Sequence, residues 1–522
     1  MLLLYHGKLH GRSPEHTALA VNQGKIVAVG SDTEVLHLDA PDADRIDLGG
    51  RYVLPGMTDS HIHLELYGAS LNKVNCATPT LQDCLGRVKA RSGELPAGKW
   101  ILGHGWNQNQ WSGRFGTAHD LDSVAPLQPV FLTDISLHSA WVNSRALDLA
   151  GINAATADPA GGAIQRDDRG NPTGILLENA VQLVESIIPP ITVEERKHDL
   201  LVAQDKLLRF GITSAHDFDR IPCFSALQQL DAEGELILRV FKSLPVDHLA
   251  EAIALGLKTG FGSPHLRVGP VKMFADGALG PQTAAMLSPY EGNQDNLGKL
   301  LLTAEEIFET GMRAARSGLS LAIHAIGDRA THETLKGFAQ LREYEKQFGF
   351  PALQHRVEHL QLLSPHELAQ ASHYGICASM QPVHLYMDKR TADRHWGNRS
   401  RYAYAMASLR AHNTALVFGS DAPVENPNPF WGIHAAVTRC AQGSVDSWYA
   451  EECIDLADAF AAYTWEPARQ AGLAQKLGEL KTGQLADLVV LDQNPYQLDP
   501  DEIYSIKPVM VMVDGIWVHR TY

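Results

Sequence analysis

Long apolar runs are missing from this chain of 522 residues. No segment approaches the ~18 consecutive apolar residues that suggest a membrane-spanning helix. The first residues, MLLLYHGKLHGRS, start with an apolar run, but His6, Lys8 and His10 interrupt it at once. A secretion signal has a longer apolar core than this. The sequence therefore predicts a soluble protein of the cytoplasm, without a membrane partner.

Cysteine is also scarce, since the six cysteines are scattered and none forms a CxxC pair. This spacing argues against a disulfide scaffold and against a zinc site built from thiolates. Basic residues are in the minority: 44 lysines and arginines stand against 60 aspartates and glutamates, for a net charge of −16. The field of such a protein repels polyanions, which argues against nucleic acid as a partner. A small-molecule substrate is the expected partner, and a homo-oligomer is left open.

What the chain has in quantity is an ordinary globular composition, with 45% hydrophobic and 20% charged residues. Its length suits one large domain and a smaller one. It also contains 24 histidines. Because neutral imidazole is the commonest side-chain ligand of metals, the histidines are the first place to look for chemistry.

Both ends of the chain consist of short apolar runs separated by turn signals. LLLYHGK, ALAVNQGKIVAVG and RIDLGGRYVLPG lie near the N-terminus, and LADLVVLD and PVMVMVDGIWVH lie near the C-terminus. The steps Asn22-Gln23-Gly24 and Gly49-Gly50 suit hairpin turns. Neither end can bury a sheet alone, so we expect residues 1–55 and 478–522 to form one composite β-sandwich domain. Two separate hairpins packed on the main body are the alternative.

Between these ends, apolar strand patterns alternate with amphipathic helical stretches such as residues 304–318 and 364–375. This alternation is typical of a parallel (β/α)8 TIM-like barrel, which we expect over residues 56–477. The fold class is therefore α/β. The eight expected strands are 57–64, 211–218, 236–243, 268–276, 319–327, 355–362, 375–382 and 415–423.

The interval of about 65–210, between the first two barrel strands, is too long for a single crossover and must contain an insertion. Aromatic and amide side chains in it suit a lid or a substrate wall over the barrel mouth. An ordinary packed subdomain is an equally weighted alternative. The side chains in question are Trp106, Trp111, Trp141, Asn107, Gln108, Asn109, Gln110 and Asn143.

Polar residues gather toward the C-terminal parts of five expected strands. His61 and His63 are two positions apart, so on a strand both imidazoles project from the same face. An HxH pair alone is weak, because many such pairs lie on the surface. Four further strands carry Lys272, His324, His359 and Asp421. Since that end of a barrel holds the active site, one shared site is a better explanation than six unrelated core or surface residues.

Longer motifs give a specific resemblance. LPGMTDSHIHL, VKMFADGALG, HAIGDRA, RVEHLQL, SMQP, FGSDAPVENPNPFWGIHAAVTR and GELKTGQLADLVVLD follow one another over nearly the whole chain. In this series the chain resembles the amidohydrolase superfamily. Within it, the chain is most similar to the YtcJ-like metal-dependent hydrolases of amidohydrolase family 3, which include N-substituted formamide deformylases. The resemblance implies a distorted β/α barrel with a composite β-sandwich, in agreement with the strand pattern.

The resemblance also implies metal ligands. His61 and His63 match the pair that binds the more buried metal, and His324 and His359 match the ligands of a second metal. Lys272 matches a lysine that the family carboxylates with carbon dioxide, giving a carbamate that bridges two metals. If Lys272 stays a plain ammonium it repels metal, and a one-metal site follows.

Two further positions match residues that act on the substrate side. Asp421 matches the aspartate that contacts the metal and the catalytic water. His216 matches a histidine near the barrel mouth, where a substrate-facing role competes with a structural one. Imidazole and carboxylate ligands suit zinc. The implied cofactors are therefore one or two divalent metal ions per chain, with zinc expected, and carbon dioxide as the carbamate.

Two segments depart from the family pattern. Ser136-Leu137 stand where Asp-Gly is usual, and Pro281-Gln282 stand where Ser-Arg is frequent. The second change removes an arginine suited to an anionic group of the substrate. The substrates of relatives therefore do not transfer directly to this chain.

The sequence thus predicts a metal-dependent amidohydrolase acting on carbon–nitrogen bonds other than peptide bonds. The expected substrates are N-substituted formamides or N-acyl amines, attacked by metal-bound hydroxide while Asp421 moves the proton. A metal-dependent deaminase, lyase or isomerase on the same barrel is the nearer alternative, since a fold does not fix a function. A catalytically silent binding protein is the more distant one.

Overall fold

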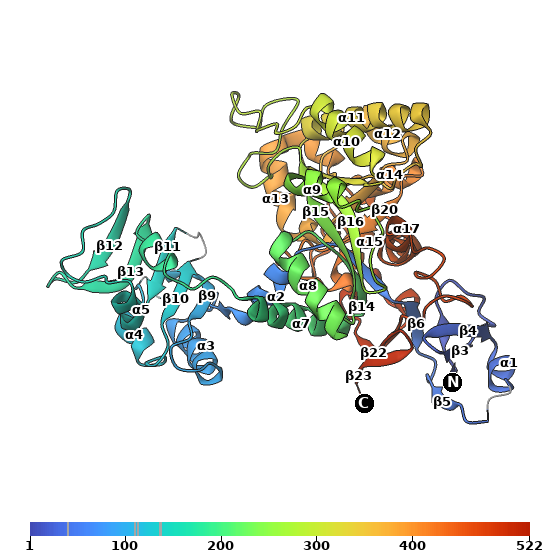
Figure 1. Ribbon diagram of the computed structural model, residues 1–522, viewed down its shortest axis with the longest axis horizontal. Coiled ribbons are helices and arrows are strands. Elements are labelled where there is room, and N and C mark those ends of the chain that lie inside the picture. The colour runs from blue at the N-terminus through green and yellow to red at the C-terminus, as the bar shows by residue number, and fades with distance from the viewer. Residues whose placement is uncertain (39–40, 109–110, 112–113, 135–137, 522) are drawn as a thin grey trace. The chain divides into compact units, whose positions relative to one another are not determined.

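The computed structural model describes residues 1–38, 41–108, 111, 114–134 and 138–521. Its centre is a parallel sheet in the order β20-β19-β18-β17-β16-β15-β14-β7, which curves into a nearly closed barrel (Figure 1). Each of the eight strands overlaps the segment predicted for it, so the predicted α/β barrel is confirmed. The strands are β7 (Met57–Ile62), β14 (Ile212–Asp217), β15 (Arg239–Pro245), β16 (Leu266–Phe274), β17 (Leu321–Ala325), β18 (Arg356–His359), β19 (Cys377–Met380) and β20 (Leu416–Phe418).

The two edge strands, β7 and β20, meet through a small set of hydrogen bonds. The amide of Asp421, just after β20, donates to the carbonyl oxygen of His61 at 2.7 Å. Asp59 accepts hydrogen bonds from the amide and the hydroxyl of Ser420 at 3.1 and 2.6 Å. A Cβ on Gly419 would lie 2.4 Å from the backbone nitrogen of His61, so only glycine permits this approach. Closing the barrel therefore brings Asp421 beside His61.

Helices follow the barrel strands and cover the outside of the barrel (Figure 1). In the longer amphipathic stretch predicted from the sequence, Thr303 forms a capping box with Glu306, and Ile307 and Ala314 are buried. Most of these helices and strands share one large core, and a second cluster packs Leu227 and Leu230 of the first helix against strand residues such as Ile212. The helices are α8 (Ile221–Glu233), α9 (Leu249–Ala254), α10 (Ala304–Arg316), α11 (Asp328–Phe348), α12 (Leu368–His373), α13 (Leu385–Trp396), α14 (Met406–Ala411), α15 (Pro429–Thr438), α16 (Leu456–Tyr463) and α17 (Trp465–Gln470).

Two further sheets are built from the ends of the chain, with strand orders β4-β3-β1-β5 and β2-β6-β21-β22-β23. In the second sheet an N-terminal strand pairs with a C-terminal one, with Val53 opposite Val490. Both residues share a core with Leu4 and Leu19 of the first sheet, which confirms the composite β-sandwich and excludes two separate hairpins. Its boundaries at residues 55 and 478 stay a prediction. The elements are β1 (Leu2–Tyr5), β2 (Lys8–Leu9), β3 (Ala18–Asn22), β4 (Lys25–Gly30), α1 (Asp32–Leu36), β5 (Asp44–Asp47), β6 (Tyr52–Pro55), β21 (Leu488–Leu491), β22 (Pro508–Val513) and β23 (Ile516–Arg520).

The two predicted hairpin turns have different outcomes. The step at Gln23 and Gly24, with φ of 47° and 73°, joins β3 to β4 in an antiparallel pair. Gly49 and Gly50 also have positive φ, at 58° and 79°. The hairpin predicted there is wrong, because β5 pairs with β1 while β6 pairs with β21. This turn carries the chain from one sheet to the other.

A buried arginine links the C-terminal strands to the barrel. Arg239, at the start of β15, donates through Nε and Nη2 to the two carboxylate oxygens of Asp487 at 2.7 and 3.0 Å. Its Nη2 also contacts Asp514, in the turn between β22 and β23. Bidentate pairs of this kind are among the stronger hydrogen-bonded contacts in proteins. They fix the β-sandwich to the base of the barrel.

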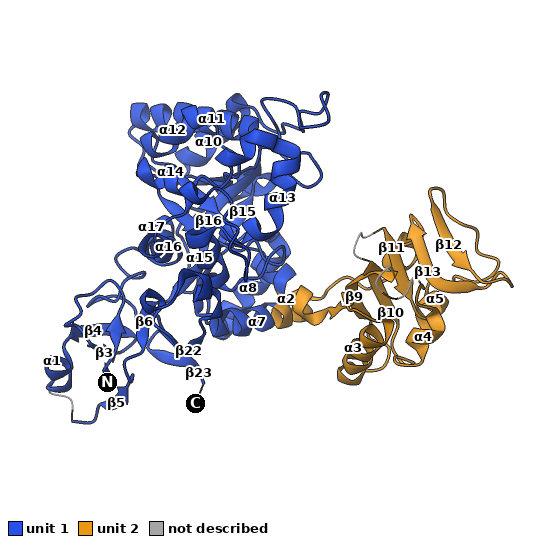
Figure 2. Cartoon of the chain, turned by 180° about the vertical axis from the view of Figure 1, so that it is seen from behind, with its two compact units in different colours: residues 1–67, 200–522 blue, residues 68–199 orange. Residues whose placement is uncertain are grey.

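The long interval after β7 folds as a compact unit, residues 68–199, and residues 1–67 and 200–522 form the other unit (Figure 2). The boundaries fall within α2 (Leu64–Asn72) and α7 (Val193–Arg209). Unit 68–199 contains a mixed sheet in the order β12-β13-β11-β10-β9-β8. Its elements are β8 (Val74–Asn75), α3 (Leu81–Glu94), β9 (Ile101–Trp106), α4 (Ala118–Asp122), β10 (Val130–Asp134), β11 (Ser139–Val142), α5 (Ser144–Leu149), β12 (Gly162–Arg166), β13 (Pro172–Glu178) and α6 (Gln182–Glu185).

The tryptophans of unit 68–199 are core residues. Trp106, Trp111 and Trp141 are at most 3% exposed, and their rings pack against one another. Each indole N–H donates to a backbone carbonyl, of Leu132, Thr78 and Thr117 respectively. These three side chains therefore belong to the core of a packed subdomain, as the alternative interpretation expected, and a lid or substrate wall over the barrel mouth stays a prediction. Asn109 and Gln110 lie outside the described residues, as do Ser136 and Leu137.

Among the described residues, no helix is both long enough and apolar enough to cross a membrane. All six cysteines are free thiols, five of them buried.

Removal of residues 485–522 should destabilise the N-terminal strands. The deletion takes away buried residues such as Leu488 and Val490, each worth about 1.5–3 kcal/mol of burial, and it uncovers the edge of β6. We expect aggregation or a clearly lower melting temperature in scanning calorimetry. The control lacks only Thr521 and Tyr522 and should melt like the full chain. An unchanged melting temperature and metal content in the longer deletion would contradict the composite sandwich.

Candidate metal centre and active site

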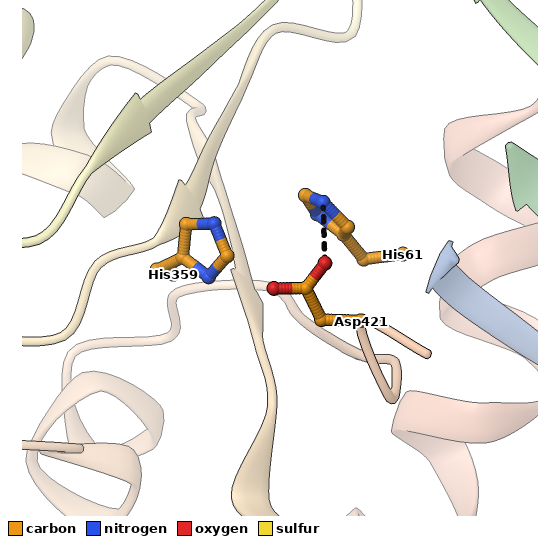
Figure 3. Close-up of side chains that lie close together, drawn as sticks. All are labelled: His61, His359 and Asp421. Carbon is orange, nitrogen blue, oxygen red and sulfur yellow. Dashed lines mark ion pairs between the residues drawn. The ribbon is translucent and has the colours of Figure 1, made fainter. Parts of the chain in front are cut away.

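Predicted site residues converge at the C-terminal end of the barrel strands. The ring centroids of His61 and His359 are 5.0 Å apart, and those of His324 and His359 are 4.5 Å apart. Oδ1 of Asp421 lies 3.6 Å from Nε2 of His61 and 3.3 Å from Nε2 of His63. In Figure 3, His61, His359 and Asp421 turn toward one another from separate segments of the barrel.

Three of these side chains form a compact set of possible metal ligands. His61, His359 and Asp421 each offer one ligand atom, and the three atoms lie within 4.8 Å of one another. The two histidines are buried, at 2% and 7% exposure. Two imidazoles and a carboxylate suit a divalent ion such as zinc. That these residues bind metal stays a prediction.

The orientation of the imidazoles fits metal binding, because their other ring nitrogen is held by an oxygen. Nδ1 of His61 lies 2.6 Å from Oε2 of Glu358. Nδ1 of His359 lies 2.8 Å from Oε1 of Gln381. When Nδ1 donates to these oxygens, Nε2 carries the lone pair that a metal needs, as is usual for histidine ligands.

Glu358 keeps its negative charge inside the barrel through an adjacent arginine. Burial alone would raise the pKa of Glu358, but Arg356 and His61 hold it well below its usual value. Arg356 contacts both carboxylate oxygens of Glu358 and also donates to the carbonyl oxygen of Ser60 in β7. A charged carboxylate accepts a stronger hydrogen bond than a neutral one, so His61 is held firmly in one tautomer.

His61 and His63 differ in protonation although both face Asp421. Burial and, after it, the charge of Lys272 lower the pKa of His61 to about 4. Burial also acts to lower the pKa of His63, but hydrogen bonds to Asp219 and Asp421 outweigh it and raise the value to about 9. Burial acts to raise the pKa of Asp421, but His61, His63 and His359 outweigh it and hold this pKa well below its usual range. Asp421 is therefore ionised. A pKa of about 9 places a proton on His63 at neutral pH.

Lys272 is buried beside the histidines. Its Nζ lies 4.9 Å from the ring centroids of both Phe218 and Phe274. Burial lowers the pKa of Lys272 to about 8, although Glu358 and Asp421 act in the opposite direction. A substantial part of the amine is therefore neutral near pH 8, which is the form that reacts with carbon dioxide.

Two predicted site residues, His324 and His216, lie outside the compact ligand set and make hydrogen bonds to other groups. Nε2 of His324 lies 2.9 Å from the carbonyl oxygen of Gly277, and His324 is not in the compact ligand set. Burial, followed by the charge of Lys272, lowers the pKa of His324 to about 3. Nδ1 of His216 accepts a hydrogen bond from Nη1 of Arg356 at 2.8 Å, and His216 is 3% exposed. Both roles assigned from the sequence, second-metal ligand and catalytic residue, stay predictions.

A second group with possible ligands, Asp217, Asp219 and Cys223, is satisfied by the protein itself. Nζ of Lys242 lies 2.8 Å from Oδ2 of Asp217, and both side chains are fully buried. Asp217 and Asp219 also accept hydrogen bonds from the amides of residues 64 and 65 at the start of α2. Burial raises the pKa of the Cys223 thiol well above its usual value, so it is no thiolate. This group positions the segment that carries His63.

The sequence did not identify the residues that hold the imidazoles. Arg356 and Glu358 alternate within β18, and charged residues inside a barrel strand are a usable signal of an interior role. Gln381 and Asp219 carry no comparable signal. His384, whose ring lies 6.5 Å from that of His359, was also missed.

Comparison with known proteins gives a consistent family. A family model described as "Amidohydrolase family" matches residues 44–519. The chain is 32% identical to the protein LONG AFTER FAR-RED 3 of Arabidopsis thaliana, covering 92% of this chain and 85% of that protein. It is 28% identical to the N-substituted formamide deformylase of Arthrobacter pascens, covering 96% and 94%.

A solved structure agrees with the fold. It is an uncharacterised metal-dependent hydrolase from Pyrococcus furiosus, with 29% sequence identity and a TM-score of 0.77. The match covers 95% of this chain and all of that chain.

Replacement of Gln381 by methionine should weaken metal binding. The change removes the acceptor of the Nδ1 proton of His359, and loss of such a partner typically costs about 10–100-fold in metal affinity. Folding should change little, because Nε2 of Gln381 has no hydrogen-bond partner in the described part of the chain. Competition with a chromophoric zinc chelator measures the affinity.

Glu345→Gln is the matched control. Its carboxylate is 3.0 Å from Nε2 of His355, at the opposite end of β18, so this change should lower the melting temperature and leave metal affinity unchanged. Equal zinc affinity in Gln381→Met and the unmodified protein would show that Gln381 does not orient a ligand.

Proposed function

The chain belongs to the amidohydrolase family, and on this premise we propose that it hydrolyses an amide-type carbon–nitrogen bond of a small molecule. The substrate class proposed is an N-substituted formamide or an N-acyl amine. The observation that carries the proposal is the set of His61, His359 and Asp421, whose ligand atoms lie within 4.8 Å of one another. The name of the deformylase relative supports the choice of bond.

A divalent ion held by these side chains, with zinc proposed, would polarise a carbonyl oxygen and lower the pKa of a water molecule toward ~7. Asp421 is ionised and its side chain is 14% exposed, with Nε2 of His61 and of His63 within 3.6 Å of its Oδ1. Its carboxylate therefore takes the proton of the attacking water and returns it to the leaving nitrogen. Proton transfer by a positioned group contributes about 10²–10⁴-fold to rate.

Lys272 is proposed to carry the carbamate. The ammonium first loses one proton. The neutral amine then adds to carbon dioxide: a nitrogen–carbon bond forms, one carbon–oxygen π bond opens onto oxygen, and a second proton leaves the nitrogen. A side chain of charge +1 thus becomes a carbamate of charge −1 with two ligand oxygens. The pKa of about 8 supports this step, because it leaves neutral amine available at physiological pH. The negative group would then sit among His61, His359 and Asp421 and hold a second metal ion together with His324.

The proposed setting is the cytoplasm, with a small molecule as substrate. Six free thiols, most of them buried, suit a reducing compartment. The net charge of −16 continues to argue against nucleic acid or an anionic membrane as partner.

The function is tested on protein of measured metal content with three substrate classes: N-substituted formamides, N-acyl amines and cyclic imides. We expect release of an amine and a carboxylic acid from a formamide or an N-acyl amine. Asp421→Asn should lower kcat/KM by about 10²–10⁴-fold. Asp446→Asn, a change at a 79% exposed side chain, is the control and should leave turnover unchanged.

Release of ammonia, or of an isomer of the substrate, would instead support the deaminase, lyase or isomerase alternative. Metal-loaded protein that turns over none of the three classes would contradict the proposed hydrolysis.

Lys272→Ala tests the carbamate. Without the bridging group, metal content should fall to one ion or fewer per chain, and turnover should fall about 10²-fold or more, since a catalytic metal is worth several kcal/mol. A short carboxylic acid added in solution should restore part of both by filling the vacated place. Lys336→Ala, on α11, is the control. If Lys272→Ala keeps two metal ions and full turnover, Lys272 is no ligand.

A further inference from the structure

A basic depression lies at the base of the barrel, away from the candidate metal centre. We call it the basal pocket. It has a volume of about 370 Å³ and is lined by the start of β4, by residues 262–267 leading into β16, and by residues 473–477 and 483–485. All these segments belong to the unit of residues 1–67 and 200–522. The basal pocket therefore lies where the barrel and the β-sandwich meet.

The ionisable side chains that line the basal pocket are all basic. They are Lys25, Arg239, Arg267 and Lys476, and no aspartate or glutamate lines the basal pocket among the described residues. Arg239 pairs with two carboxylates, Asp487 and Asp514, so this group carries one net negative charge and the other three cations still leave a positive excess. This local excess of positive charge occurs in a chain with a net charge of −16.

The other three cations make no ion pair with a carboxylate in the described part of the chain. Arg267 donates from Nε to the carbonyl oxygen of Gly260 at 2.8 Å and from Nη1 to that of Ala471 at 3.4 Å. Burial lowers the pKa of Arg267 below its usual value, and no acidic group opposes this effect. A half-buried guanidinium with only neutral partners is costly, and a bound anion would remove that cost.

We propose that the basal pocket binds a small multivalent oxyanion, either inorganic phosphate or the phosphate group of a small molecule. Nη2 of Arg267 makes no hydrogen bond within the described part of the chain, so its N–H groups can donate to a phosphate oxygen. Lys25 and Lys476 supply point charges from two separate segments, the N-terminal strand β4 and the residues after α17. The volume corresponds to roughly a dozen water molecules, enough for a phosphate with a small organic group.

This site is separate from the metal centre. Arg267 and Lys272 lie on the same strand, β16, five residues apart, which spans about 16 Å. An anion in the basal pocket joins three segments that are distant in sequence. Because the anion binds only the folded chain, it should raise the free energy of unfolding.

The test uses the full-length protein and calorimetric titration with sodium phosphate, at an ionic strength held constant with sodium chloride. We expect saturable binding at one site per chain and a melting temperature higher by about 2 °C or more at saturation. The double variant Lys25→Gln/Lys476→Gln should bind at least tenfold more weakly. Both lysines are exposed, so the variant should melt normally without phosphate.

Two controls locate the binding. Lys336→Gln, on the barrel helix α11, removes one positive charge elsewhere and should bind phosphate like the unmodified protein. His359→Ala, which alters the candidate metal centre, should also bind like the unmodified protein. Titration with glycerol phosphate distinguishes the two sources, since the tighter of the two ligands indicates a free ion or a phosphorylated molecule.

The proposal is overturned if phosphate gives no saturable binding beyond that of chloride, or if the double variant binds as tightly as the unmodified protein. Binding that is lost in His359→Ala and kept in the double variant would assign the anion to the metal centre, and would equally overturn it.

Discussion

The ion pair between Arg356 and Glu358 is the contact on which the interior of the barrel depends. Both side chains lie on β18 and are at most 1% exposed. Removing one partner of such a buried pair typically costs about 3–5 kcal/mol, because the other charge is left uncompensated. The pair also reaches three other strands: Glu358 contacts His61 on β7, and Arg356 contacts His216 on β14 and Ser379 on β19. One charged pair thus sets both the shape of the interior and the tautomer of a candidate ligand.

The candidate metal centre and the contacts that attach the β-sandwich lie at opposite ends of the barrel. At the C-terminal ends of the strands, His61 near the end of β7 and His359 at the end of β18 meet Asp421, which follows β20. Non-glycine residues with positive φ occur here, with His359 at 70° and Asp421 at 58°. At the opposite end, Arg239 and its two aspartates fix the sandwich. Loops at one end can therefore change the chemistry without disturbing the contacts that stabilise the fold, as is general for such barrels.

Most of the fold could be predicted from the sequence, since each barrel strand is a short apolar run bounded by turn residues. The position of His61, His324 and Asp421 at strand ends followed from the same pattern. The partners of the imidazoles could not be predicted, because Glu358 lies 297 residues from His61 and meets it only through the closed barrel. Local pattern also failed at Gly49 and Gly50, where positive φ serves equally well in a hairpin and in a crossing between sheets.

The composite sandwich has a consequence for how the chain is made. β6 ends at Pro55 and its partner β21 begins at Leu488, so roughly 430 residues must be synthesised between them. At about 5–20 residues per second, the ribosome needs on the order of 20–90 s for this interval. During that time the edge of β6 that pairs with β21 has no partner strand, and such an edge can pair with other chains. Folding of the first part of the protein is thus completed only by the last part, which makes the emerging chain a natural client for chaperones until synthesis ends.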